Sequence, residues 1–126
     1  MATVREVMST GLYYVTPGTK VGEAVALMAQ HRIGSVLVME GDRLVGIFTE
    51  RDTVRALSQT YDAPSHEVSS WMTANPITIR PETLVQDALR TMLANNFRHL
   101  PVMNGDDVAG IVSIRDLAKQ ETAGGK

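Results

Sequence analysis

The sequence predicts an α/β fold of the α+β sandwich type, built twice in tandem, with each copy a small sheet packed on two helices. Three observations carry this prediction. The 126-residue chain repeats itself at a constant offset of 64 residues. Each repeat contains an apolar stripe with the spacing of an amphipathic helix. Each then continues with two short apolar runs separated by a turn, which is the pattern of a β-hairpin.

The repeat extends over nearly the whole chain. Identical residues recur at the offset from one end of the unit to the other: Val4 and Val68, Pro17 and Pro81, Thr19 and Thr83, Met28 and Met92, Gly46 and Gly110, Asp52 and Asp116. The sequence predicts residues 1–60 as the first repeat, 61–120 as the second and 121–126 as a flexible tail. Because a chain of about 60 residues buries too little of its surface to be stable alone, we expect the two repeats to pack together.

The first half of each repeat reads as an extended segment followed by a helix. The extended segment lies around residues 13–16 in the first repeat and 77–79 in the second. Val21, Ala24, Val25 and Met28 then form a stripe at helical spacing. In the second repeat, Thr83 and Gln86 have the spacing of a capping box, in which a hydroxyl and an amide side chain satisfy free backbone amides. The sequence therefore predicts a Thr-capped helix here.

The second half of each repeat reads as a hairpin followed by another helix. The first strand of the hairpin is predicted at residues 35–39 in the first repeat and at residues 100–103 in the second. The apolar runs LVGIF and VAGIV are the predicted second strands. The second turn contains Asn104 and Gly105, which tolerate the positive φ of hairpin turns. In the helix of the first repeat, Val54, Leu57 and Tyr61 fall on one side.

Composition excludes several classes of function. The net charge of −2 and the scattered basic residues give no electrostatic footprint for nucleic acid or an anionic membrane. No apolar run reaches the roughly 20 residues that span a bilayer, and the N-terminus has no signal-peptide core, so we expect a cytoplasmic protein. Without cysteine there is no disulfide or thiol chemistry. The three histidines are far apart in sequence, so no metal site is expected.

One motif occurs at the end of each hairpin and admits two interpretations. In GIFTERD and GIVSIRD, a hydroxyl residue is followed three positions later by aspartate: Thr49 with Asp52, and Ser113 with Asp116. This spacing suits a helix cap, with the carboxylate at the positive end of the helix dipole. It also suits a ligand clamp, because a helix N-terminus attracts anionic groups. One residue pair can serve both purposes.

The ordered motifs resemble a known family. Met72-Thr73, Pro76–Ile79, Arg98–Val102 and Gly110–Asp116 follow one another as they do in the cystathionine β-synthase (CBS) domain pair, or Bateman module, here standing alone. The resemblance implies a non-catalytic regulatory module that binds an adenosine-containing ligand in clefts between the repeats. The candidate ligands are AMP, ADP, ATP and S-adenosylmethionine, with no catalytic cofactor. It also implies a homodimer that signals to a separate, unknown effector protein.

The resemblance also implies roles for particular residues. Ribose would be held by Thr49 with Asp52 and by Ser113 with Asp116. The base would meet Tyr13, Ile33 and Gly34 in one pocket and Ile77, Phe97 and Arg98 in the other. The candidates for phosphate are Arg51, Arg98, His99 and Arg115. We favour Arg98 over His99, because a guanidinium is always charged and its planar fork suits phosphate.

Two further expectations concern the difference between the two pockets and the alternative functions. Gly34 and Ser35 occupy the positions that Arg98 and His99 hold in the second repeat, so the two pockets should be unequal. The main alternative function is a structural dimerisation module whose clefts hold no ligand. An enzyme is not supported, because the sequence has no paired acids, no Ser-His-Asp set and no glycine-rich phosphate loop.

Overall fold

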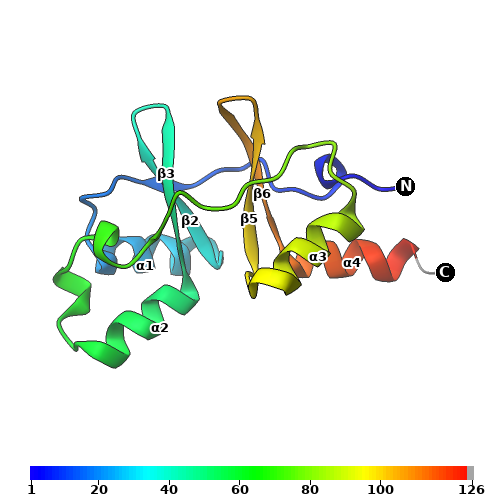
Figure 1. The fold of residues 1–126 in the computed structure, drawn as a ribbon. Coiled ribbons are helices and arrows are strands. Elements are labelled where there is room, and N and C mark those ends of the chain that lie inside the picture. The colour runs from blue at the N-terminus through cyan, green and yellow to red at the C-terminus, as the bar shows by residue number, and fades with distance from the viewer. Residues whose placement is uncertain (125–126) are drawn as a thin grey trace. The chain divides into compact units, whose positions relative to one another are not determined.

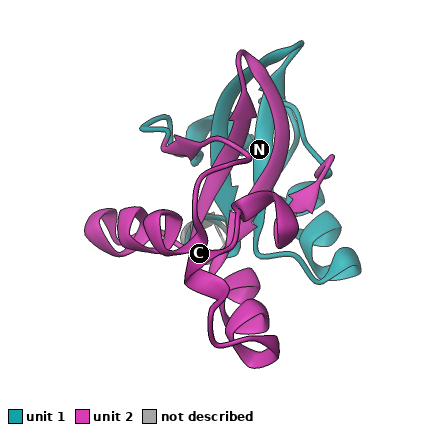
Figure 2. Ribbon diagram, turned by 90° about the vertical axis from the view of Figure 1, so that its left-hand side faces the viewer, with its two compact units in different colours: residues 1–12, 77–126 teal, residues 13–76 magenta. Residues whose placement is uncertain are grey.

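The structure, a computed structural model, describes residues 1–124 of the chain, with side chains as far as Gln120. It divides into two compact units that differ from the sequence repeats (Figure 2). Unit 1 combines Met1–Leu12 with Ile77–Lys126, and unit 2 is Tyr13–Pro76. The opening segment of the chain therefore folds with the second repeat, which the predicted boundaries at residues 60 and 120 did not anticipate.

Unit 2 is a four-stranded sheet with two α-helices (Figure 1). The strands lie in the order β1-β2-β3-β4; β1 runs parallel to β2, and the other neighbours are antiparallel. Its elements are β1 (Tyr14–Val15), α1 (Val21–His31), β2 (Ser35–Glu40), β3 (Arg43–Thr49), α2 (Glu50–Gln59), the short 3-10 helices η2 (Ala63–Ser65) and η3 (Val68–Ser70), and β4 (Thr73–Ala74). The predicted order of helix, hairpin and helix is confirmed in this unit.

Unit 1 has the same order of elements around a two-stranded hairpin. Its elements are η1 (Val4–Glu6), α3 (Val85–Asn95), β5 (His99–Asn104), β6 (Asp107–Ser113) and α4 (Ile114–Gly124). Single bridges join Ser9 to Ile111 and Ile79 to Val102, so an extended segment lies along each side of the hairpin. The predicted tail, residues 121–126, begins inside α4, and residues 125–126 lie outside the described part of the chain.

A segment that we call the arm completes each unit: residues 1–12 in unit 1 and 65–76 in unit 2. In unit 1, the Val4 amide donates to the Thr83 carbonyl at 2.8 Å, and Ser9 and Ile111 exchange two backbone hydrogen bonds. The same contacts recur in unit 2 at the offset of 64 residues, with Val68 donating to Thr19 and Thr73 pairing with Ile47. Each arm therefore forms backbone hydrogen bonds both with the turn before a helix and with the second strand of a hairpin.

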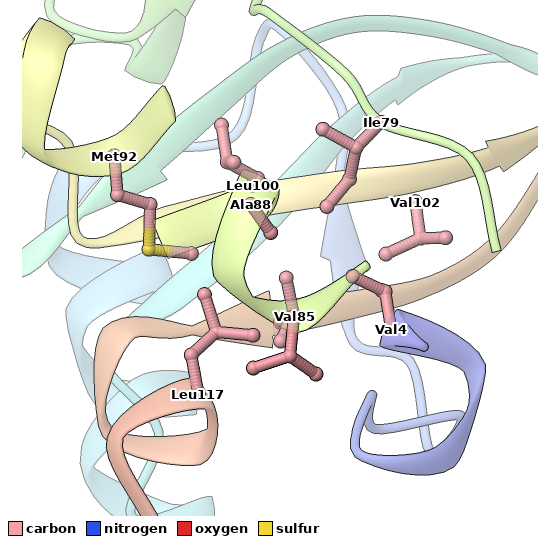
Figure 3. Packing of buried hydrophobic residues seen from close by; sticks show 9 residues of the cluster. Val4, Ile79, Val85, Ala88, Met92, Leu100, Val102 and Leu117 are labelled. Carbon is pink, nitrogen blue, oxygen red and sulfur yellow. The ribbon is translucent and has the colours of Figure 1, made fainter. Parts of the chain in front are cut away.

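The core of each unit draws on its arm as well as on its helices and hairpin. In unit 1 the buried cluster consists of Val4, Ile79, Val85, Ala88, Met92, Leu100, Val102, Val112 and Leu117 (Figure 3). In unit 2 it consists of Val15, Val21, Ala24, Met28, Val36, Val38, Phe48 and Val68. The arm residues Val4 and Val68 are both fully buried. Burial of apolar surface therefore fixes each arm to its unit.

The predicted capping box at Thr83 and Gln86 is wrong. The helix α3 has Leu84 at its N-cap without a side-chain cap, and the Thr83 hydroxyl instead accepts the Arg80 amide at 3.2 Å. The first helical amide, that of Val85, donates to the carbonyl of Ala2 in the arm at 3.1 Å. A backbone carbonyl thus satisfies the orphan donor, which leaves the hydroxyl to stabilise the turn before the helix.

Both hairpin turns use glycine at a positive φ, which residues with a side chain rarely adopt. Gly41 has a φ of 62° and Gly105 a φ of 65°. The structure confirms Gly105 as a turn residue, whereas Asn104 pairs with Asp107 as the last residue pair of the hairpin. The two loop residues are therefore Gly105 and Asp106, one residue further along the chain than the predicted Asn104 and Gly105.

Candidate functional site

The Thr49–Asp52 pair lies where β3 ends and α2 begins. The Thr49 hydroxyl accepts the Asp52 amide at 3.3 Å, and Asp52 Oδ2 accepts from the Thr49 amide at 2.9 Å and from its hydroxyl at 3.1 Å. Asp52 is only 7% exposed. The helix-cap interpretation is therefore confirmed for this pair, and its two side chains are hydrogen-bonded to one another.

The Ser113–Asp116 pair occupies the same place between β6 and α4. Asp116 Oδ2 accepts the Ser113 amide at 3.0 Å, and the Ser113 hydroxyl accepts the Asp116 amide at 3.1 Å. Both residues are half-buried. This pair is also a helix cap, and its side chains are more accessible than that of Asp52.

In unit 2, the start of β2 lies beside the Thr49–Asp52 pair. The Gly34 carbonyl accepts the Glu50 amide, the first of α2, at 3.0 Å. Ile33 packs against the core of the unit. The Tyr13 carbonyl accepts a hydrogen bond from the Leu37 amide at 3.2 Å. The Tyr13 ring stacks on the His31 ring, with 4.0 Å between the ring centroids. The structure thus brings Gly34 to the start of α2, and it holds the exposed Tyr13 beside β2.

Unit 1 places its predicted residues in the corresponding positions. The Arg98 carbonyl accepts the Ile114 amide, the first of α4, at 2.8 Å, and His99 pairs with Ser113 across the hairpin. Phe97 packs against the core, whereas Ile77 is exposed. Arg98 and the Ser113–Asp116 pair therefore meet at the start of α4.

The four candidate phosphate ligands differ in exposure. Arg51 and Arg115 lie in the first turns of α2 and α4 and are exposed. Arg98 precedes β5 and is also exposed, whereas His99 is half-buried. An exposed guanidinium beside a helix N-terminus is placed to meet an anion. The preference for Arg98 over His99 stays a prediction.

Sequence reasoning missed Arg55, which contacts the carboxylate of the Thr49–Asp52 pair. Its Nη2 lies 3.4 Å from Asp52 Oδ1 and donates to the Trp71 carbonyl at 2.6 Å, and its guanidinium lies 5.2 Å from the centroid of the Trp71 ring. The spacing of three residues between Asp52 and Arg55 is a helical ion-pair signal. The contact with Trp71 has no such signal, because it depends on the path of the arm.

The same network continues from Trp71 to Asp62. Trp71 Nε1 donates to His66 Nδ1 at 3.3 Å, and His66 Nε2 lies 3.2 Å from Asp62 Oδ1. A hydrogen bond from the Thr60 hydroxyl is the main cause that holds the pKa of Asp62 below its ordinary value. A chain of polar contacts therefore links the segment after α2 to Arg55 and the helix cap.

Two absences apply to the described residues. Among residues 1–124, no helix has both the length and the apolar character needed to cross a bilayer. Among the side chains that the structure describes, which end at Gln120, no three histidine or acidic groups lie closely enough together to hold a metal ion.

Comparison with known proteins identifies the family. A protein-family model of the CBS domain matches residues 4–59 and again residues 68–121. An uncharacterized 17.7 kDa protein in the bps2 3′ region of Acidianus ambivalens is 43% identical over 123 residues, which cover 94% of this chain and 73% of the relative.

Two solved structures that resemble the chain contain adenosine compounds. The CBS domain pair of protein MJ0100, in complex with 5′-methylthioadenosine and S-adenosyl-L-methionine, has a TM-score of 0.89 and 26% identity, with 100% of this chain and 99% of that one covered. CBSX2 in complex with AMP has a TM-score of 0.83 and 26% identity, with both chains fully covered. The chain described here belongs to the CBS domain family and carries that domain twice.

Proposed function

We propose that this chain is a non-catalytic regulatory module that binds an adenosine-containing small molecule. The observation that carries the proposal is the hydroxyl–carboxylate pair that each unit holds at a helix start, beside the first residue of a hairpin. Its support from relatives is that solved CBS domain pairs contain AMP, 5′-methylthioadenosine or S-adenosylmethionine.

The chemistry of these residues suits the parts of an adenosine ligand. A carboxylate accepts hydrogen bonds from the two ribose hydroxyls, which is the role of Asp52 or Asp116. A phosphate is favoured by the dipole of α4 and by the guanidinium of Arg98. Apolar and aromatic side chains beside the strand starts provide surfaces for the base: Tyr13 and Ile33 in unit 2, and Ile77 and Phe97 in unit 1.

The regulatory part of the proposal requires two conformations. A ligand shifts an equilibrium only when it binds one conformation more tightly than the other, so occupancy alone carries no signal. In this proposal, the signal passes to a separate effector protein. Recovery of a stable partner from a pull-down that depends on the added nucleotide would support this part.

Isothermal titration calorimetry with AMP, ADP, ATP and S-adenosylmethionine tests the binding function. We expect saturable binding of at least one of them. For AMP, Arg98→Met should weaken binding about tenfold or more, because a hydrogen bond to a charged group is removed. The same variant should leave the affinity for adenosine unchanged, because adenosine has no phosphate.

Arg43→Met is the matched control, because Arg43 is another exposed arginine, at the hairpin turn of unit 2. It should bind AMP like the wild type. Absence of saturable binding for all four compounds would refute the binding function.

A second candidate function, a homodimeric assembly module without ligand, is favoured by the surface of α2. On α2, the apolar residues Val54 and Leu57 are 68% and 48% exposed; Tyr61, expected on the same helical face, instead lies beyond the end of the helix at Gln59 and is 94% exposed. Apolar residues grouped on a surface favour contact with another protein. We infer that these exposed residues contact a second copy of the chain, whether or not a nucleotide binds.

Leu57→Asp should therefore convert the homodimer to a monomer in size-exclusion chromatography with light scattering, because a charge would have to be buried in the interface. Leu93→Asp is the control, since Leu93 is 66% exposed on α3, an element of unit 1. A wild-type protein that is monomeric at high concentration would contradict this inference.

A further inference from the structure

Contacts within unit 2 occupy the Thr49–Asp52 pair, and in this sense the pair is closed to a ligand. Asp52 Oδ2 accepts two hydrogen bonds from Thr49, one of them from the hydroxyl, and Oδ1 accepts from Arg55 at 3.4 Å. A ribose diol needs a carboxylate oxygen that is free to accept its hydroxyl protons. Both oxygens of Asp52 already accept hydrogen bonds, and only 10% of the side chain is exposed, so a ribose hydroxyl has little access to it.

Arg55 is itself held in place by the arm of unit 2. Its Nη2 donates to the Trp71 carbonyl at 2.6 Å, and the guanidinium lies over the indole ring. Stacking and hydrogen bonding by the same planar group restrict its orientation. The arginine is thereby kept where it reaches Asp52, even though about half of its side chain, 47%, is exposed.

The equivalent contacts are missing from the described part of unit 1. At the offset of 64 residues, Lys119 replaces Arg55 and Val7 replaces Trp71, so neither the planar cation nor the ring is present. Within unit 1, no described lysine or arginine forms an ion pair with the Asp116 carboxylate. The hydrogen bonds that Asp116 accepts from described residues involve Oδ2 only. Within unit 1, the second carboxylate oxygen of Asp116 therefore has no described cation beside it that would compete with a ribose hydroxyl.

We propose that Arg55 is a positioning residue that keeps the Thr49–Asp52 pair closed, so that the Ser113–Asp116 pair takes the ribose first. The Thr49–Asp52 pair binds a ligand only when Arg55 is displaced from Asp52. This inference rests on the proposed nucleotide-binding function and specifies how its two sites are regulated. Loss of the contact between Arg55 and Trp71 is the step that would open the second site.

Titration calorimetry of the full chain with AMP as the probe tests the inference. We expect the wild type to bind a single AMP per chain with measurable affinity. Asp116→Asn should weaken that binding about tenfold or more, since a charged acceptor of the ribose hydroxyls is lost. Asp52→Asn should weaken it much less than Asp116→Asn does, because the Thr49–Asp52 pair is already occupied by contacts within unit 2.

The decisive variant is Arg55→Met, which removes the cation and keeps an unbranched apolar side chain. It should bind a second AMP per chain, an outcome that a purely structural role of Arg55 would not produce. Lys119→Met, at the equivalent position in unit 1, is the matched control and should still bind one. Ser113→Ala replaces Asp116→Asn if that variant does not melt cooperatively.

The possible outcomes distinguish the inference from the binding function on which it rests. If the wild type binds AMP and Asp52→Asn weakens binding as much as Asp116→Asn, the inference is wrong and the nucleotide-binding function stands. The inference is also wrong, with the binding function intact, if Arg55→Met still binds a single AMP. If the wild type binds none of AMP, ADP, ATP and S-adenosylmethionine, the binding function fails, and the inference fails with it.

Discussion

Deletion of residues 2–9 is expected to unfold unit 1. The deletion removes Val4, which is fully buried in the core of this unit. It also removes the half-buried Met8, which packs against that core. It also removes the backbone hydrogen bonds that the arm forms with residues 81–85 and with Ile111. The first amide of α3 and the outer edge of β6 would both be left without these partners.

The expected loss is a large fraction of the stability of a small domain. Burial of a valine contributes about 1.5–3 kcal/mol and each backbone hydrogen bond about 1 kcal/mol. The sum exceeds about 5 kcal/mol, and small domains have free energies of unfolding of about 5–15 kcal/mol. Circular dichroism on heating should show a lower melting temperature, and hydrogen exchange should show loss of protection at the amides of Val85 and Ile111.

A single substitution in the arm, measured beside a control, provides a milder form of the same experiment. Val4→Ala should destabilise the chain by about 1–3 kcal/mol, because it leaves a cavity in a packed core. Leu93→Ala is the control: Leu93 is 66% exposed on α3, and the loss of its side chain should cost less than about 0.5 kcal/mol. A deletion variant that melts at the wild-type temperature would show that the arm does not stabilise unit 1.

Elements defined by local sequence patterns were predicted well. The stripe of α1 predicted its buried face, and Val21, Ala24 and Met28 are indeed buried. The hairpins followed from paired apolar runs, and the glycine at each turn has the positive φ that such turns require. These predictions succeed because helix periodicity and turn chemistry involve residues close together in the chain.

The arms could not be assigned from the sequence. The repeat placed Val4 and Val68 in equivalent positions, but it did not indicate which hairpin each segment joins. The pairing of Ser9 with Ile111 depends on contacts between distant parts of the chain. The error at Thr83 has the same cause, because the Ala2 carbonyl of the arm replaces the predicted side-chain cap.

The candidate site shows the same division between local and distant contacts. The caps at Thr49 and Ser113 follow from a spacing of three residues, and the structure contains both. The contact of Arg55 with Trp71 joins α2 to the arm across 16 positions, so no local pattern could reveal it. That contact distinguishes the two hydroxyl–carboxylate pairs, which look equivalent in the sequence.

Gly110→Ala is expected to destabilise unit 1 by about 1–3 kcal/mol, because it overpacks the crossing of the arm over β6. A Cβ at Gly110 would lie 2.8 Å from the Met8 sulfur and 2.8 Å from the Ser9 carbonyl oxygen. The methionine side chain can move. The Ser9 oxygen cannot move freely, because it accepts the Ile111 amide at 3.0 Å. Relief of the clash therefore requires that this hydrogen bond weaken.

Chemical denaturation of three alanine variants measures this effect against its controls. Gly46→Ala should cost less than Gly110→Ala, because its Cβ would lie 3.0 Å from the backbone oxygen of Thr73, and its closest neighbour, at 2.5 Å, is the movable Met72 sulfur. Gly11→Ala should be nearly neutral, since no atom lies within 4 Å of that Cβ. Equal losses at Gly46 and Gly110 would mean that the methionine sulfur, rather than the carbonyl of the arm, determines the cost. A neutral Gly110→Ala would mean that the arm does not cross β6 this closely in solution.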